Sequence, residues 1–439
     1  MTATPDLKTL AREIFNQTLA SVDARRAICA ALERHGSRLV VDGGEVDLAD
    51  FSSLRVVAFG KASAAMAEGL AEVLAPDYSA SGILVVPSLP PRPIPGLKLF
   101  VGGHPMPNGE SFSAGRAILD LLGKANGRTL VFFLLSGGGS ALVELPLDPS
   151  ISLYDMRQLH RALVTCGGSI DEINFVRKHL SAVKGGRLAA AAPNATKLTL
   201  AITDVPAGRE SALASGPTLP DPSTVDDAYR VVEKYKLLDR MPASLSPAFM
   251  ERQLAETPKA GDPAFARSRF VLVLDHHRLF HQAHRASESH GFATVCDNST
   301  DDWPLERAAD FLLDLLARHK HANPDRPVAL IADGEVLCRV TGDGMGGRNS
   351  AFALYVAQKI AGHPIAVLSA GTDGIDGSSP AAGAIADGTT LARARAAGLD
   401  PGDFFRRSDS YTFFARLGDA IHTGPTGNNL RDLRVLLHE

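Results

Sequence analysis

Apolar residues along the 439-residue chain fall into two alternating patterns, short buried runs and longer stretches with helical spacing. The runs at 54–59 and 129–135 predict strands, and stretches with apolar residues three and four apart predict helices between them. Strands that alternate with helices throughout predict a three-layer α/β/α fold. Because the chain is long for one core, we expect two such lobes, residues 1–245 and 262–439, joined by a polar segment containing several prolines.

Two of the predicted strands in the first half end in glycine-rich turns. Gly60-Lys61-Ala62-Ser63 follows 54–59, and Ser136-Gly137-Gly138-Gly139-Ser140 follows 129–135. Three successive glycines are costly in backbone entropy, so they suggest close approach of a phosphate or carboxylate to the N–H groups. Taken alone, Lys61 is equally well a solvated lysine at a turn. Asp204 follows a further predicted strand, and ligands of open α/β sheets collect beyond such carboxyl ends.

A third glycine turn, 342–347, lies between an apolar segment that predicts strand, at 328–331 and then 336–340, and a predicted helix at 351–360. The free N–H groups of a helix start favour an anion, so this turn predicts a phosphate site with Arg348 at its edge. The turn 371–377 adds two acids, Asp373 and Asp376, after the strand-like 365–369.

The residues from 171 to 192 predict one basic helix, which includes Arg177 and Lys178 and is interrupted by Gly185 and Gly186. A basic helix face is commonly just solvated. His277 and His281 have a spacing that suits a metal, but no third ligand is evident, so an exposed histidine-rich helix is favoured. The four cysteines lie far apart, which predicts reduced thiols rather than a zinc site or disulfides.

Charge and hydropathy limit the partners that we expect. Lys and Arg number 45 against 49 Asp and Glu, a formal charge of -4 that gives no general attraction to nucleic acid or an anionic membrane. No apolar run approaches the roughly 18 residues that span a bilayer, and the first residues lack the pattern of a signal peptide. We therefore expect a cytoplasmic protein that binds small molecules. A homodimer is one assembly that stays open.

Together the turns, the cations and the acids match the requirements of phosphoryl transfer, in which cations and N–H groups hold phosphates and carboxylates hold a divalent ion. This predicts a kinase. Gly342-x-Gly344-x-x-Gly347 also matches the GxGxxG motif of dinucleotide folds, which leaves an NAD(P)H-dependent reductase as an alternative. A non-catalytic sensor of phosphorylated acids would explain the anion sites but not the clustered carboxylates.

Several ordered motifs carry a family resemblance over nearly the whole chain. They are FGKAS at 59–63, LSGGGSAL at 135–142, INFVRKHLSAVKGGRL at 173–188, ASGPT at 214–218, GMGGRN at 344–349, GTDGIDG at 371–377 and TGPTGNNL at 423–430. The chain closely resembles the glycerate 2-kinases with a MOFRL domain, some of which are labelled hydroxypyruvate reductase. The family commonly reads GGRNQE and DVPGDD where this chain has Gly346–Ala351 and Asp204–Arg209, which leaves the metal ligands open.

The resemblance implies an N-terminal Rossmann-like lobe, a C-terminal lobe with the MOFRL domain at about 326–435, and an active site in the cleft between them. It also implies ATP- and Mg²⁺-dependent phosphorylation of D-glycerate to 2-phospho-D-glycerate, with Lys61 and Arg348 catalytic. We expect Asp204 or Asp373 to hold Mg²⁺ or orient the hydroxyl, and residues 136–140 with Arg177 or Lys178 to bind glycerate. The expected nucleotide-binding residues are Gly344, Gly346, Gly347, Asn349, Thr372, Asp373 and Thr426.

Overall fold

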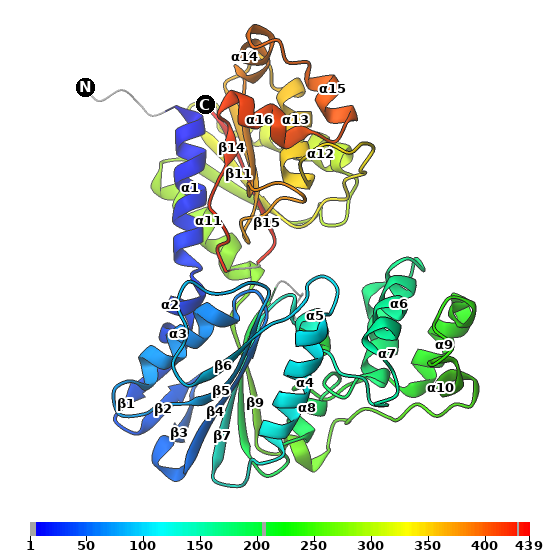
Figure 1. Ribbon diagram of the computed structural model, residues 1–439. Coiled ribbons are helices and arrows are strands. Elements are labelled where there is room, and N and C mark those ends of the chain that lie inside the picture. The colour runs from blue at the N-terminus through cyan, green and yellow to red at the C-terminus, as the bar shows by residue number, and fades with distance from the viewer. Residues whose placement is uncertain (1–5, 204–207, 428–429) are drawn as a thin grey trace. The chain divides into compact units, whose positions relative to one another are not determined.

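The computed structural model describes residues 6–203, 208–427 and 430–439. The chain divides into two compact units (Figure 1): an N-terminal unit, Ala24–Val273, and a C-terminal unit that joins Met1–Asp23 to Leu274–Glu439. The first helix, α1 (Leu7–Ser21), is therefore grouped with the C-terminal unit, whereas the sequence assigned it to the lobe at 1–245.

The N-terminal unit is built on a six-stranded sheet with the strand order β6-β5-β4-β7-β8-β9. The pairs from β6 to β8 are parallel. Counted from β4, this order is 3-2-1-4-5-6, the order of the Rossmann fold, which reverses direction between β4 and β7. The predicted Rossmann-like fold is confirmed. The strands are β4 (Ser53–Phe59), β5 (Ser81–Val86), β6 (Leu97–Val101), β7 (Thr129–Leu135), β8 (Thr196–Ile202) and β9 (Ser268–Leu274).

Helices cover both faces of this sheet, so that every residue of the central strand β7 is buried and its sequence is apolar throughout. On one face α3 (Ser63–Leu74) packs against β4, β5 and β7, with α2 (Ala24–Ala31) beside it. On the other, α4 (Gly109–Leu122) shares an apolar core with Val57, Val131 and Phe133. A small antiparallel sheet, β1 (Glu33–His35), β2 (Arg38–Val41) and β3 (Gly44–Asp47), completes the unit's edge.

Four helices with their own apolar core extend the N-terminal unit. They are α6 (Leu153–Val164), α7 (Ile170–Leu180), α9 (Val225–Lys234) and α10 (Ser246–Met250). The prediction of one helix over 171–192 is wrong. α7 stops at Leu180, because Ser181 is extended and pairs with Pro146, and the short α8 (Arg187–Ala190) begins after Gly185 and Gly186, which take left-handed backbone conformations with φ of +56° and +82°.

The C-terminal unit has a mixed sheet with the strand order β10-β11-β15-β12-β13-β14, in which β15 runs antiparallel to both of its neighbours. Its strands are β10 (Ala293–Asp297), β11 (Val328–Asp333), β12 (Ile365–Gly371), β13 (Gly383–Asp387), β14 (Ala420–Ile421) and β15 (Asp432–His438). β13 directly precedes α14 (Thr390–Ala396), so a strand and a helix follow each other closely here.

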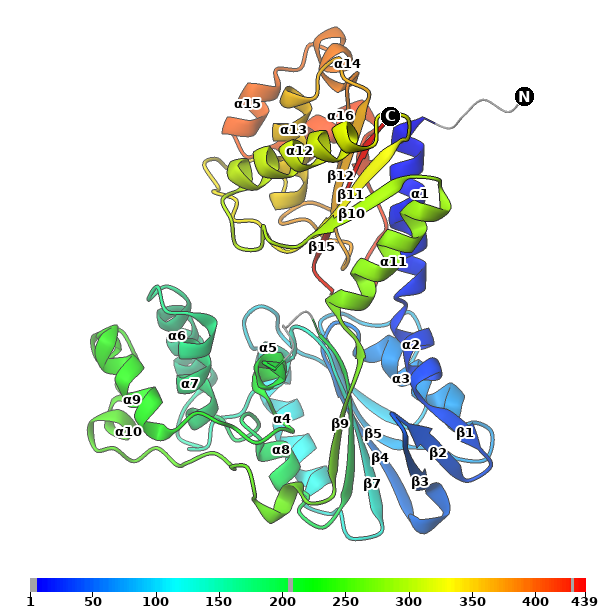
Figure 2. The ribbon, with the colours of Figure 1, turned by 180° about the vertical axis from the view of Figure 1, so that it is seen from behind.

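Helices cover both faces of the mixed sheet as well, which confirms the predicted three layers (Figure 2). On one side lie α1 and α11 (His276–Ser289), against Val435 and Leu437; on the other, α13 (Arg348–Lys359) packs over Leu436. α12 (Leu305–Ala322), α15 (Pro401–Arg406) and α16 (Ser410–Leu417) complete the second layer. The apolar face of α1, including Ile14 and Phe15, meets β12 and β15, which explains its grouping with this unit.

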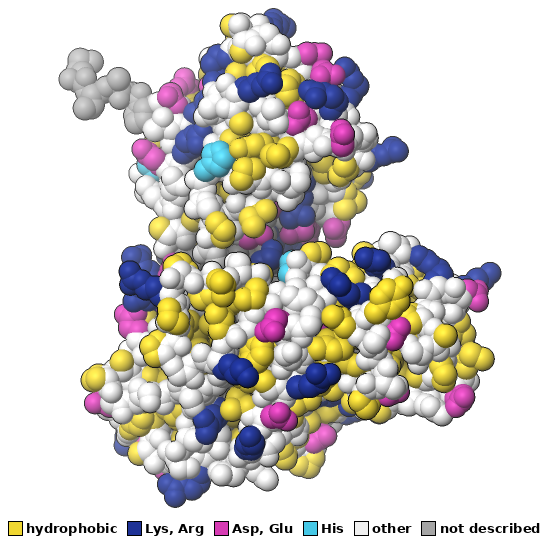
Figure 3. Space-filling model, in the orientation of Figure 1, with side chains coloured by type: hydrophobic (Ala, Val, Ile, Leu, Met, Phe, Trp, Pro, Cys, Tyr) yellow, Lys and Arg dark blue, Asp and Glu magenta, His cyan; other side chains and the backbone are white. Residues whose placement is uncertain are grey.

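Surface charge is mixed. On the face seen in Figure 3, Lys and Arg side chains are interspersed with Asp and Glu, as the near-balanced composition leads us to expect. All four cysteines are free and half-buried.

Candidate functional site

The two glycine turns of the N-terminal unit meet where its sheet reverses strand order. The Lys61 N–H donates to the Gly137 carbonyl at 2.9 Å, and the Ser136 N–H donates to the Phe59 carbonyl at 3.2 Å. The Ser136 hydroxyl also accepts a hydrogen bond from the Ala62 N–H at 2.9 Å. The structure thus brings the predicted Lys61 and the turn at 136–140 together at the crevice position of a doubly wound sheet.

Glycine is required in both turns by close approach. Gly60 has φ +126°, and a Cβ there would lie 2.2 Å from the Ser136 hydroxyl. Gly138 has φ +83°, and its Cβ would meet His104 Cδ2 at 3.1 Å and Lys61 Cγ at 3.5 Å. His104, which follows β6, therefore belongs to the site although no motif singled it out.

A chain of side-chain hydrogen bonds ties this turn to α7. The Ser140 and Ser215 hydroxyls are hydrogen-bonded, and Ser215 donates in turn to Asn174 Oδ1 at 3.1 Å. Ser215 and its neighbour Ala214 both have positive φ, +62° and +50°. Strain of this kind in residues with side chains accumulates at ligand sites, so the 214–215 bend is part of the candidate site.

The two basic residues of α7 have different surroundings. A terminal nitrogen of Arg177, Nη2, lies 2.6 Å from His160 Nδ1, and burial lowers the pKa of Arg177 against the opposing pull of Glu144. Lys178 instead forms a buried ion pair, with Nζ 3.0 Å from Asp221 Oδ1. Successive helical residues diverge by about 100°. The geometry therefore favours Arg177 over Lys178 as a ligand of a bound anion.

His160 lies close to the basic side chains Arg177, Lys184 and His104. Burial, and then the positive charges of Arg177 and Lys184, lower the pKa of His160 to about 4, with His104 adding to the effect. The imidazole is therefore neutral at physiological pH. Asp204, predicted as a catalytic and metal-binding residue, lies outside the described residues.

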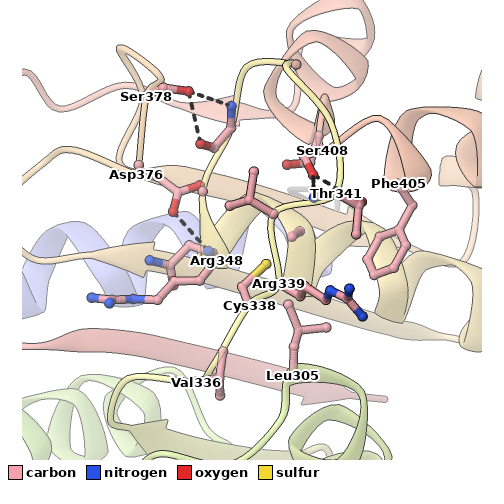
Figure 4. A pocket seen from close by; sticks show the side chains of 18 of the residues that line it. Leu305, Val336, Cys338, Arg339, Thr341, Arg348, Asp376, Ser378, Phe405 and Ser408 are labelled. Carbon is pink, nitrogen blue, oxygen red and sulfur yellow. Dashed lines mark hydrogen bonds between the residues drawn. The ribbon is translucent and has the colours of Figure 1, made fainter. Parts of the chain in front are cut away.

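A cavity of about 920 Å³ lies in the C-terminal unit between the loop that precedes α13, the turn at 371–377 and the segment at 405–410. Figure 4 shows Leu305, Val336 and Cys338 on one side of this pocket and Thr341 and Ser378 on the other. Its lining includes the predicted nucleotide-binding residues Gly344, Gly346, Gly347, Asn349 and Asp373, together with Arg348.

The start of α13 is already occupied by a carboxylate. Asp376 is 2% exposed and accepts hydrogen bonds from the Asn349 N–H at 2.9 Å, the Ser350 N–H at 2.8 Å and the Ser350 hydroxyl at 2.6 Å. Burial raises the pKa of Asp376 although these donors oppose the shift. The Asn349 and Ser350 N–H groups of this helix start are therefore taken by a protein acid and are not open to a phosphate.

The glycines before α13 serve the packing of the loop itself. A Cβ at Gly344 would lie 2.5 Å from Asp409 Cβ, and one at Gly347 would lie 2.3 Å from Asp376 Oδ1. The strand predicted before this turn is confirmed at 328–331, in β11, and wrong at 336–340, because β11 ends at Asp333 and irregular backbone follows up to α13. The GxGxxG motif thus lacks the strand-to-helix turn that a dinucleotide fold requires.

Arg348 is held by two acids. Its Nη2 lies 2.8 Å from Glu335 Oε1, and its Nε donates to Asp432 at 2.5 Å. Burial opposes the charged form, but the two carboxylates outweigh it and raise the pKa of Arg348 above its ordinary value. The guanidinium is charged and fixed in orientation at the pocket.

Other predicted nucleotide residues have structural partners. The Asn349 side chain accepts from the Ser369 hydroxyl at 2.7 Å and is 1% exposed. Thr372 donates to the Arg431 carbonyl at 2.7 Å, and the Thr426 hydroxyl donates to the Thr372 carbonyl. These side chains hold the turn at 371–377 against the segment before β15.

Asp373 and Asp432 are carboxylates that could help to hold a magnesium ion. A Cβ on Gly371 would stand 3.1 Å from Asp373 Oδ1 and 3.4 Å from Asp432 Oδ1, so both acids border one point at the end of β12. Among the described residues no group of three His, Cys, Asp or Glu side chains could hold a metal. Mg²⁺ commonly needs only one or two carboxylates beside substrate phosphates, so this donor set suits the ion.

The fold defines a two-lobed α/β protein with glycine-rich turns in each lobe and a nucleotide-sized pocket in the C-terminal one. The model of a domain of unknown function, DUF4147, matches residues 10–250, and that of the MOFRL family matches 328–432. A D-glycerate 2-kinase of Thermotoga maritima is 35% identical, covering 98% of both chains. A protein of Agrobacterium vitis, provisionally named as a hydroxypyruvate reductase, is 35% identical over 97% of this chain and 93% of its own.

A solved structure agrees with these sequence comparisons. The crystal structure of a glycerate kinase from Thermotoga maritima matches with a TM-score of 0.84 and 34% identity, covering 99% of both chains. The chain belongs to the MOFRL-domain family of glycerate 2-kinases. Within the described residues, no helix has the length and apolarity needed to cross a membrane.

Proposed function

We propose that this protein transfers the γ-phosphoryl group of ATP to the 2-hydroxyl of D-glycerate. The names of its relatives support glycerate phosphorylation. ATP as the donor, the position of transfer and the residues below are inferences from the site.

The observation that carries the proposal is the pocket beside Arg348. Its 920 Å³ falls within the usual range for small-molecule sites of about 300–1,000 Å³. Three large apolar side chains on its lining are unusually exposed: Leu337 at 58%, Val340 at 76% and Ile375 at 50%. Exposed apolar surface beside charged groups suits a ligand with a flat base and a phosphate tail. We assign ATP to this pocket, with its phosphates toward Arg348 and Asp373.

The acceptor acid is assigned to the N-terminal unit. Lys61, the turn at 136–140 and the Arg177 guanidinium supply positive charge and N–H groups for a carboxylate. The reaction then requires the phosphate held by one unit to reach the hydroxyl held by the other.

Catalysis in this scheme is mainly electrostatic. Phosphoryl transfer spreads negative charge over the moving group, and preorganised cations stabilise it without further reorganisation. Arg348, fixed by Asp432 and Glu335, meets that requirement, and Lys61 adds a second cation. Mg²⁺, when bound, neutralises phosphate charge; Asp373 and Asp432 would hold it, and Asp204 is retained as a further ligand or as the group that orients the hydroxyl.

One comparison tests the proposal against the reductase alternative suggested by the Agrobacterium vitis relative. Purified protein is given ATP, Mg²⁺ and D-glycerate, and ADP release is measured; in parallel it is given NADH and hydroxypyruvate. We expect ADP and 2-phosphoglycerate only, because the GxGxxG segment does not follow a strand. NADH oxidation without ADP release would overturn the proposal.

A further inference from the structure

Glu144 is the carboxylate that lies near the basic side chains Arg177 and Lys184, and its oxygens already accept hydrogen bonds. Glu144 is 6% exposed and accepts from Lys184 Nζ at 2.7 Å, the Ser181 hydroxyl at 2.7 Å and the Leu145 N–H at 3.0 Å. Its charge therefore compensates the fully buried Lys184 first, and Arg177 lacks a carboxylate in hydrogen-bond contact among the described residues. A guanidinium in this position suits an external anion.

Arg177 is held by an imidazole instead of an acid. Its Nη2 lies 2.6 Å from His160 Nδ1 and 3.1 Å from Nε2, so one guanidinium edge faces the ring. A protonated imidazole would only donate hydrogen bonds and would repel Arg177, whereas a neutral ring has one accepting nitrogen. The charges around His160, from Arg177, Lys184 and His104, all oppose its protonation, while Glu144 is taken by Lys184.

Arg177 also lies on the side of α7 that faces the glycine turn. Asn174 is one helical turn earlier on the same face, and it is tied through Ser215 to Ser140. His160, which contacts Arg177, interacts with the charge of His104, and His104 and Lys61 both lie against the Gly138 turn, so Arg177 belongs to the surroundings of this turn.

We propose that His160 is a positioning residue for the acceptor site: by accepting a hydrogen bond from Arg177, it turns the free edge of the guanidinium toward the carboxylate of a hydroxy acid. The inference rests on the proposed function and explains how the acceptor site selects its substrate. The ligand class is a small 2-hydroxycarboxylate, and neutral polyols of the same size are disfavoured because the paired N–H groups of Arg177 would go unmatched.

The test compares two substitutions of His160 in the full-length protein. His160→Phe keeps a planar ring but removes the acceptor, and His160→Asn keeps an oxygen near the Nδ1 position. We expect KM for D-glycerate to rise about tenfold in His160→Phe, with kcat within about twofold and KM for ATP unchanged, and to stay near the wild-type value in His160→Asn. Arg161→Gln, on the same helix and exposed, is the matched control.

Inhibition by two small molecules is a measurement that a simple loss of packing would not change selectively. Inhibition by lactate, which keeps the carboxylate, should weaken about tenfold in His160→Phe, and inhibition by 1,2-propanediol should not change. Unchanged glycerate affinity in His160→Phe, equal losses in both variants, or a loss in kcat alone would overturn the inference.

Calorimetric titration with D-glycerate in the absence of nucleotide separates this inference from the proposed function. If the wild type binds glycerate but releases no ADP, the kinase proposal fails while the role of His160 is still measured by the change in affinity. If the wild type is an active kinase and His160→Phe binds glycerate as tightly, only the inference fails.

Discussion

Asp333 shows at the scale of one residue how the C-terminal unit holds an unfavourable acidic group in its interior. It ends β11 with 0% exposure, and neither carboxylate oxygen has a hydrogen-bond partner among the described residues. Burial raises its pKa to about 6, although Arg431 acts in the opposite direction. A buried carboxylate without donors destabilises the fold when it is ionised.

Removing this charge should stabilise the unit in a pH-dependent way. The folded pKa of Asp333, about 6, exceeds its ordinary value of 3.8. The folded state therefore binds more protons between these values, and stability falls as pH rises through that window. At pH 7.5 we expect Asp333→Asn to raise the free energy of unfolding, measured by urea denaturation, by up to about 3 kcal/mol. At pH 4 the free energy of unfolding should rise little. An equal gain at both pH values would show that charge is not the cause.

Lys61 and Arg348 are the side chains on which the proposed chemistry depends. We expect Lys61→Met and Arg348→Met each to lower kcat by about 10²–10³-fold, the usual loss when one preorganised charge-stabilising group is removed. Circular dichroism should stay that of the wild type. Lys124→Met and Arg395→Met remove exposed cations from the same two units and should leave kcat unchanged. Near-normal turnover in both site variants would refute the assignment.

At the scale of an element, α13 depends on an acid from another loop for its first turn. Asp376 takes three donors there, two of them backbone N–H groups that the helix leaves unpaired. We expect Asp376→Asn to lower the free energy of unfolding by about 1–3 kcal/mol, because an amide has one accepting oxygen and no charge for the helix dipole. Urea unfolding measures this. Asp373→Asn, in the same turn, should change stability much less.

The same element shows what the sequence can and cannot predict. The strand, turn and helix around Lys61 follow from an apolar run that only Arg55 interrupts and from a glycine, and the structure confirms each at 53–74. The glycines before α13 look alike in sequence, yet they exist to admit Asp376 and Asp409, which come from distant segments. Local pattern indicates that a close approach occurs but not which group approaches.

Residues without a motif were missed for the same reason. β13 and β15 are built from small or mixed residues that also suit a helix, and their pairing partners decide their conformation. His104 and His160 become part of the site only through contacts with Gly138 and Arg177, which no spacing in the sequence reveals.

At the scale of the whole molecule, α1 connects the first residues of the chain to the last strand. Phe15 is fully buried against the sheet of the C-terminal unit. We expect Phe15→Ala to destabilise that unit by about 3–5 kcal/mol. In hydrogen exchange, amides of β12 and β15 should lose protection while those of β4 and β7 keep theirs. Ile28→Ala in α2 should produce the reverse pattern, and identical patterns in the two variants would contradict the division into units.

This pairing of α1 with β15 sets an order of events on the ribosome. The helix is translated before any strand of its sheet, and β15, which covers Phe15, is the last of these strands to leave the exit tunnel. During elongation the Rossmann-like unit has all its strands and can mature, while the amphipathic helix ahead of it stays uncovered and open to chaperones. The emergence of β15 is then the event that closes the second core.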